Sequence, residues 1–197
     1  MQKDVNYKDR DDRSLTHAFR DGDERAFEEI VQRYHRQVAN IIYLTLGSRK
    51  DVEDLTQDVF IRVHGSLGRV TVETTLFSWI YRIAVNIAID EARRRRIRKI
   101  VSMDFLTDPG GKEYEPQDPG RASDNVLAGE KREQVLAALR RLSPAHKAAL
   151  ILREYKDLSY REIAETLRIS EQAVKSRIFR AREEMKRLLK NYFRERT

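Results

Sequence analysis

The sequence predicts an all-α protein made of two small helical domains joined by an extended acidic linker. Apolar residues recur with helical spacing along most of the 197 residues, and no segment shows convincing strand alternation. Three of the four prolines and three of the eight glycines fall between residues 109 and 120. Because these residues interrupt helices, we expect one domain at 15–100, a linker at 101–125 and a second domain at 126–193.

The first domain is expected to begin with a long helix that Asp23 caps and that ends near Gly47. A second helix is predicted from about residue 50 to residue 64. Its apolar stripe is formed by Val52, Leu55, Val59 and Val63. The polar residues Glu53, Asp54, Gln57 and Asp58 lie nearly opposite this stripe. An ordinary solvated helix face would have the same pattern, so the acids alone do not decide between a docking surface and a solvated one.

A longer helix is predicted from about residue 76 to residue 99, after a loop that contains glycine and threonine. Its core stripe consists of Leu76, Ile80, Ile83 and Ile87. An adjacent stripe carries Trp79, Arg82, Asn86, Asp90 and Arg93. The helix ends in a segment, 93–99, in which six of seven residues are basic. Such a cluster is typical of a surface that binds nucleic acid.

The second domain is expected to start with a helix at about 126–142. Ser143 and Pro144 then open another helix, with serine as the cap and proline at the first helical position. This helix should pack Ala148, Leu150, Ile151 and Leu152 beneath the segment that follows. The expected result is two small helical cores, one in each domain.

Residues 158–187 predict a short helix, a tight turn and a longer basic helix. Ser159 and Glu162 have the spacing of a capping box, and Ser170 should cap the second helix after a turn at 168–169. On that helix Val174, Ile178, Ala181 and Met185 form a buried stripe. The opposite side carries Gln172, Ser176, Phe179 and Glu183, and it is flanked by Lys175, Arg180, Arg182 and Lys186. This pattern favours a DNA-reading helix-turn-helix, although plain helical hairpins share part of it.

Composition narrows the function classes. The net charge is +7, with basic residues clustered at 93–99 and 175–187 and acids at 51–58. This distribution suggests two nucleic-acid surfaces and one acidic surface for a protein partner. There is no cysteine, the four histidines are scattered, and no phosphate loop or nucleophile motif is present, so we expect no cofactor, no metal and no enzyme chemistry. We find no signal peptide and no membrane-spanning run, and expect a soluble cytoplasmic protein without membrane insertion.

Together, segments 51–62, 77–96 and 142–187 strongly resemble a bacterial sigma factor of the sigma-70 family, in the extracytoplasmic-function (ECF) group. The resemblance covers residues 15–190, and its motifs stand in the expected order. It implies a protein that binds core RNA polymerase, recognises promoters and opens DNA. The first domain would then be sigma region 2 and the second sigma region 4. The resemblance also implies regulation by an anti-sigma factor and binding to the β flap of the polymerase.

The resemblance assigns roles to the first domain. Glu53, Asp54, Gln57 and Asp58 would dock on the clamp coiled coil of the polymerase β′ subunit. Asn86 matches the asparagine of the family's Ala-x-Asn motif and would face the −10 element, while the loop at 66–75 would capture a base of the single-stranded non-template strand. Trp79 could stack on unpaired DNA, but packing in the core or at its boundary is the role that its residue type favours. Arg93, Arg94, Arg95 and Arg96 would neutralise phosphates.

The second domain would read the −35 element as duplex DNA. Lys175, Ser176, Phe179 and Arg180 would meet base edges, with Gln172 beside them, and Arg177 and Arg182 would hold phosphates. The acidic linker would thread toward the active-site cleft and RNA exit path of the polymerase, or serve only as a solvated connection.

Two other classes compete with this assignment. A response regulator with the same kind of helix-turn-helix would need an α/β receiver domain. A DNA recombinase would need a nucleophile or a metal cluster. Only a promoter-specificity subunit requires stoichiometric binding to core polymerase, which makes co-purification the discriminating observation.

Overall fold

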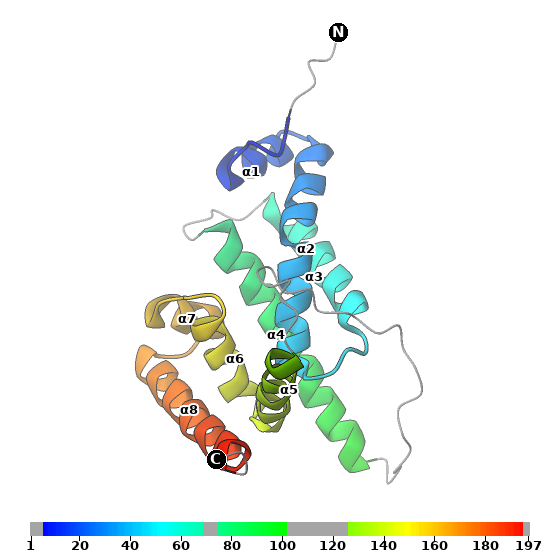
Figure 1. Ribbon diagram of the computed structural model, residues 1–197. Helices are drawn as coiled ribbons and strands as arrows, with labels where there is room; N and C mark the ends of the chain where they lie inside the picture. Colours follow the sequence, from blue (N-terminus) through cyan, green and yellow to red (C-terminus); the bar gives the residue numbers. More distant parts are fainter. Residues whose placement is uncertain (1–5, 69–74, 102–125, 195–197) are drawn as a thin grey trace.

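A computed structural model describes residues 6–68, 75–101 and 126–194, and these residues form eight α-helices and no strand. The first four helices are α1 (Asp12–Arg20), α2 (Glu24–Leu46), α3 (Val52–Leu67) and α4 (Leu76–Val101). The last four are α5 (Val126–Arg141), α6 (Pro144–Glu154), α7 (Tyr160–Leu167) and α8 (Glu171–Arg194). The predicted linker lies outside the described residues, apart from residue 101. Figure 1 shows α6 and α7 beside α4, so the two groups of helices pack against each other.

Helix α1 was not predicted from the sequence. Asp11 caps it by accepting a hydrogen bond from the Ser14 backbone N–H at 2.8 Å. Two side chains of α2 then hold it: Arg33 Nη1 lies 2.8 Å from Asp12 Oδ1, and the Tyr34 hydroxyl donates to the same carboxylate. Burial and this hydrogen bond raise the pKa of Tyr34, so the phenol stays protonated.

The predicted helices of the first domain are confirmed. Asp23 caps α2, and Gly47 ends it with a φ of 69°, which favours glycine. A Cβ at Gly47 would lie only 2.6 Å from Arg140 Cγ, so glycine also permits close approach of the second domain. The predicted stripe of α3 is buried, and in α4 Leu76, Ile80 and Ile87 are buried while Ile83 is partly buried. Both helices extend two or three residues beyond their predicted ends.

The predicted starts of α6, α7 and α8 are also confirmed. The Ser143 side chain accepts a hydrogen bond from the His146 backbone N–H, with Pro144 in the first turn. Ser159 and Glu162 form the capping box of α7. Arg168 then adopts a left-handed φ of 53° and turns the chain into α8, where Ser170 Oγ accepts from the Ala173 N–H at 3.2 Å.

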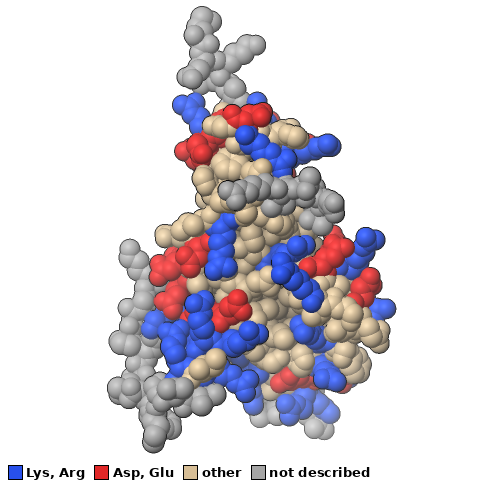
Figure 2. Space-filling model, turned by 180° about the vertical axis from the view of Figure 1, so that it is seen from behind, with Lys and Arg blue, Asp and Glu red and all other residues tan. Residues whose placement is uncertain are grey.

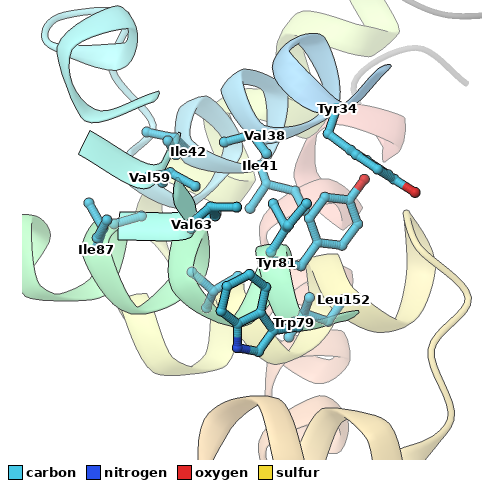
Figure 3. Close-up of a cluster of buried hydrophobic side chains, with 14 of the residues drawn as sticks. Tyr34, Val38, Ile41, Ile42, Val59, Val63, Trp79, Tyr81, Ile87 and Leu152 are labelled. Carbon is cyan, nitrogen blue, oxygen red and sulfur yellow. The ribbon is translucent and has the colours of Figure 1, made fainter. Parts of the chain in front are cut away.

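The prediction of two separate cores is wrong. One continuous cluster joins buried residues of α1–α4 to residues of the second domain, including Ile151, Leu152 and Ile163. In Figure 3, Leu152 of α6 lies beside Tyr81 and Trp79 of α4. A small satellite cluster, formed by Leu142, Leu150 and Ala181 with Leu139 and Met185, is confined to the second domain. Helix α6 is apolar on more than one side, and sequence periodicity does not show which helix each apolar side packs against.

Within the part of the chain that the structure describes, no helix is long and apolar enough to cross a bilayer.

Candidate DNA-binding and partner-binding surfaces

The outer face of α8 is exposed along the first half of the helix. The opposite face buries Val174, Ile178 and Ala181 against the rest of the second domain, so the helix cannot rotate without losing its core contacts. Phe179 is 66% exposed, which is unusual for a large apolar side chain that has no binding role. The residues predicted for this face that are exposed are Gln172, Lys175, Ser176, Phe179, Arg180 and Arg182.

Helix α7 positions α8 through a well-defined start. Glu162 Oε2 accepts a hydrogen bond from the Ser159 backbone N–H at 2.7 Å, and the Glu162 N–H donates to Ser159 Oγ at 3.3 Å. The hydrogen bonds from Ser159 lower the pKa of Glu162, so the carboxylate remains ionised in its capping role. The short turn after α7 therefore presents α8 at a fixed angle.

The two arginines of α8 that were predicted to hold phosphates differ from the other residues predicted to bind the −35 element. Arg177 is half-buried. Arg182 makes a two-nitrogen contact with Glu154 of α6, at 2.5 Å through Nη2 and 3.1 Å through Nε. This hydrogen bond raises the pKa of Arg182, although a guanidinium is charged at neutral pH in any case. In this structure Arg182 thus ties α8 to α6, a contact that residue spacing did not reveal.

The acidic face of α3 is exposed as predicted. Glu53, Asp54, Gln57 and Asp58 all lie on the surface, and Glu53 Oε2 is 3.5 Å from His35 Nε2. The face continues into Ile61, which is 68% exposed and was not singled out from the sequence. The signal was present, because Ile61 follows Asp54 and Asp58 at helical spacing and falls off the buried stripe. An exposed isoleucine among carboxylates is a pattern expected for a protein-binding surface.

The arginines of α4 are organised around a carboxylate that the sequence analysis missed. Glu91 is only 8% exposed. It accepts hydrogen bonds from Arg95 Nε at 3.1 Å and Arg98 Nη2 at 2.6 Å, and it lies 3.3 Å from Arg94 Nε. The sequence does contain this pattern, because Arg94, Arg95 and Arg98 follow Glu91 by three, four and seven residues and therefore lie on its side of the helix.

The predicted phosphate-binding arginines are therefore not equivalent. Arg95 Nη2 also contacts Asp51 Oδ2 at 2.8 Å and the Lys50 carbonyl at 3.1 Å, so it joins α4 to the start of α3. Arg93 lies 3.8 Å from Asp90 and is exposed. Arg96 is exposed as well. Arg93, Arg94 and Arg96 are thus the most accessible of the predicted four.

The residues predicted to face the −10 element lie in different environments. Trp79 is only 9% exposed and belongs to the core, in line with the packing role, so its ring cannot stack on a base in this arrangement. Asn86 is half-buried, one helical turn beyond Arg82 on the same stripe. Of the predicted base-capturing loop, residues 69–74 lie outside the described residues. In the described ranges, no three His, Asp or Glu side chains converge as they would around a metal ion.

Figure 2 shows basic side chains gathered over the lower half of one face, with acidic groups among them. A helix-turn-helix with an exposed basic helix, an arginine-rich helix end and a separate acidic face has the features of a DNA-binding protein that also docks on a protein partner. The fold therefore defines the class as all-α proteins with a helix-turn-helix in the C-terminal part of the chain.

Comparison with known families gives the identification. Residues 30–98 match sigma-70 region 2, and residues 132–185 match sigma-70 region 4. The chain belongs to the sigma-70 family of RNA polymerase sigma factors, in the ECF group.

Characterised relatives are similar over nearly their whole length. The chain is 31% identical to the RNA polymerase sigma-H factor of Pseudomonas aeruginosa over 191 residues, covering 93% of this chain and 96% of the relative. It is 33% identical to the ECF sigma-E factor of Haemophilus influenzae over 176 residues, covering 87% and 92%. The corresponding factor of Escherichia coli K12 is 32% identical over 179 residues, covering 87% and 91%.

Solved structures share the fold. CnrH, in a complex with the cytosolic domain of CnrY, has a TM-score of 0.65 at 24% identity and covers 91% of this chain and 97% of its own. The sigma factor RpoE of Bartonella quintana, in a complex with the anti-sigma factor NepR, has a TM-score of 0.65 at 22% identity and covers 83% and 96%.

Proposed function

We propose that this ECF sigma factor directs core RNA polymerase to promoters by reading the −35 element with α8 and by recognising and opening the −10 element with α4 and the loop before it. The observation that carries the proposal is the exposed outer face of α8, held by a buried stripe and a capped helix-turn-helix. On this face Lys175, Ser176 and Arg180 can reach base edges, and Phe179 offers apolar contact to thymine methyl groups.

The polymerase contact is assigned to the acidic face of α3. Its carboxylates suit the guanidinium groups of a basic partner, and Ile61 adds an apolar contact at the same surface. The partner regions are the clamp coiled coil of β′ for α3 and the β flap for the second domain. In this role the chain binds and positions other molecules in the cytoplasm and catalyses no reaction of its own.

The −10 role rests on α4 and the loop before it. Asn86 is half-buried on the stripe of α4 that also carries Arg82, and Arg93, Arg94 and Arg96 lie further along the helix as phosphate contacts. An anti-sigma factor is a further proposed partner, because the RpoE structure with this fold was solved with one. The division into domains 15–100 and 126–193 with a linker at 101–125 belongs to the same proposal.

A response regulator is a poorer match. Its receiver domain would require a β-sheet, whereas the described residues of the N-terminal half are helical. A recombinase would need a nucleophile or metal cluster, and no observation favours either one.

Run-off transcription with core polymerase on a genomic promoter library tests the proposal. The chain should yield discrete transcripts from promoters that share −35 and −10 elements. A variant carrying Asp54→Lys and Asp58→Lys should lose these transcripts while it keeps its affinity for isolated −35 duplex. If the wild-type chain neither binds core polymerase nor adds transcripts, the proposed function is wrong.

A further inference from the structure

A cavity of about 310 Å³ lies between the start of α4 and α7, two helices that Figure 1 shows beside each other. Its volume is at the lower end of the range found for small-molecule sites. Its described lining residues belong neither to the outer face of α8 nor to the acidic face of α3, and all of them are polar or charged. The cavity therefore has the chemistry of a site for a small polar ligand.

The α4 wall of the cavity offers hydrogen-bond donors and one positive charge. At the start of the helix, the Ser78 backbone N–H donates to Thr75 Oγ1 at 3.3 Å, and the two hydroxyl oxygens are 2.9 Å apart. Arg82 follows one helical turn later, and its Nε is buried without a hydrogen-bond partner among the residues that the structure describes. A buried donor without a partner is costly, so a ligand that accepts a hydrogen bond from it is favoured.

The α7 wall carries two carboxylates and one guanidinium group. Glu162 Oε2 accepts hydrogen bonds from the Ser159 N–H and hydroxyl, both at 2.7 Å, and these bonds lower the pKa of Glu162. Glu165 Oε1 accepts from Arg161 Nε at 3.2 Å. One arginine against two carboxylates leaves this wall with an excess of one negative charge. Each carboxylate can accept further hydrogen bonds, because its two oxygens offer about four lone-pair sites.

The two walls are therefore oppositely charged, and the cavity between them is neutral as a whole. A simple anion would be attracted by Arg82 but repelled by the carboxylates of α7, and a simple cation would meet the reverse. A ligand that carries both charges satisfies both walls. Amino acids hold a carboxylate and an ammonium group on one carbon atom, and a carboxylate suits the planar fork of a guanidinium group.

We propose that this cavity binds a small zwitterion of the amino-acid class. Its carboxylate accepts hydrogen bonds from Arg82 and from the hydroxyl groups of Thr75 and Ser78, and its ammonium group donates to Glu165. The proposal goes beyond promoter recognition, because it gives a small-molecule ligand to a chain whose proposed partners are all macromolecules.

Nuclear magnetic resonance of the full chain, with isotope-labelled arginine and L-serine as the probe, tests the proposal. The Nε–H signal of Arg82 is identified by its loss in Arg82→Lys. In the wild-type chain this signal should shift and saturate, with a dissociation constant of about 1 mM, as expected for a ligand with so few atoms. No saturable shift of this signal up to about 50 mM L-serine would overturn the proposal.

Two relatives of serine test the zwitterion in the wild-type chain, where no folding defect can interfere. Ethanolamine lacks the carboxylate of serine, and 3-hydroxypropionate lacks its ammonium group. Each should bind about tenfold more weakly than serine or worse, because one charged hydrogen-bond partner is missing. Equal binding of 3-hydroxypropionate would mean a plain anion site, and equal binding of ethanolamine would mean that Arg82 holds no carboxylate. Either result would overturn the proposal.

Matched variants locate the ligand. Arg82→Gln and Glu165→Gln each remove one charge from one wall and should each weaken L-serine binding about tenfold or more, as read from the Nε–H signal of Arg161. Arg25→Gln and Glu28→Gln make the same changes at exposed positions of α2 and should leave the affinity unchanged. Unchanged affinity in Arg82→Gln or in Glu165→Gln would place the ligand elsewhere and overturn the assignment.

Discussion

At the scale of single residues, the sequence predicted which side chains face outward but not which of them are already paired. The outer face of α8 followed from helical spacing because exposure depends on residues three and four apart. The pairing of Arg182 with Glu154 depends on how α6 crosses α8, and no local pattern contains that information. The same holds for Trp79, whose burial depends on packing that includes the second domain.

Arg180 and Arg182 should therefore behave differently. Arg180→Ala should weaken binding to the cognate −35 duplex by about 1–3 kcal/mol and should have little effect on a scrambled duplex, because a bidentate base contact is sequence-specific. Arg182→Ala should instead lower stability by about 0.2–1 kcal/mol, the range of an exposed ion pair. Both effects can be measured by duplex titration at two salt concentrations and by thermal unfolding. Equal losses on both duplexes for Arg180→Ala would mean that its contact is with phosphate.

Glu91 should matter more for stability than its position among arginines suggests. Glu91→Ala leaves Arg94, Arg95 and Arg98 without their shared acceptor, and we expect a loss of about 1–3 kcal/mol in the free energy of unfolding. Asp90→Ala is the matched control, because Asp90 is exposed and its nearest basic atom, on Arg93, is 3.8 Å away. Denaturant unfolding monitored by circular dichroism measures both. Equal stability in the two variants would contradict the central role of Glu91.

At the scale of helices, the starts and stripes were largely predictable, and α1 was not. Caps such as Asp23, Ser143 and Ser159 act on neighbouring backbone groups, so their effect can be read locally. Helix α1 has only nine residues, and its position depends on Arg33 and Tyr34, more than 20 positions away. A helix this short is marginal by itself, so tertiary contacts decide its presence.

The acidic face of α3 gives a prediction at this scale. Asp58→Lys should weaken binding to core polymerase by about 2 kcal/mol or more, since it sets like charges against each other at the interface. Helical content should not change, because Asp58 is exposed and the stripe beneath it is intact. Glu28→Lys makes the same charge change on the exposed part of α2 and serves as the control. Unchanged affinity of Asp58→Lys in a polymerase titration would remove α3 from the interface.

At the scale of the whole molecule, the sequence predicted two helical domains but not their contact. The residues that join the domains, among them Gln37, Tyr81 and Lys156, have no periodic relation to one another. Burial lowers the pKa of Lys156 to about 8, and burial also lowers the pKa of Lys147, at the α2–α6 contact, to about 8. Two lysines with lowered pKa values at one interface link its strength to pH.

The direction of this pH dependence follows from the lowered values. A lysine binds more protons when the two domains are apart, where its pKa is the ordinary 10.5, than within the contact, where its pKa is about 8. Raising the pH from about 7 to about 9 should therefore strengthen the contact between the two domains, which thermal unfolding at the two pH values can measure. Lys156→Met removes one of the two groups and should reduce the slope. Lower stability of the wild-type chain at pH 9 than at pH 7 would contradict the assignment.

The most direct test of the account is a distance between two spin labels, measured in the free chain and then in the complex with core polymerase and a promoter found by run-off transcription. The sequence has no cysteine, so Glu28→Cys on α2 and Lys190→Cys on α8, both exposed, are unique attachment points. We predict that the distance on the promoter exceeds the distance in the free chain by several tens of ångströms, because α4 and α8 then occupy elements about 25 base pairs, or roughly 85 Å, apart. An unchanged distance in a transcriptionally active complex would contradict the claim that the two domains read separate promoter elements.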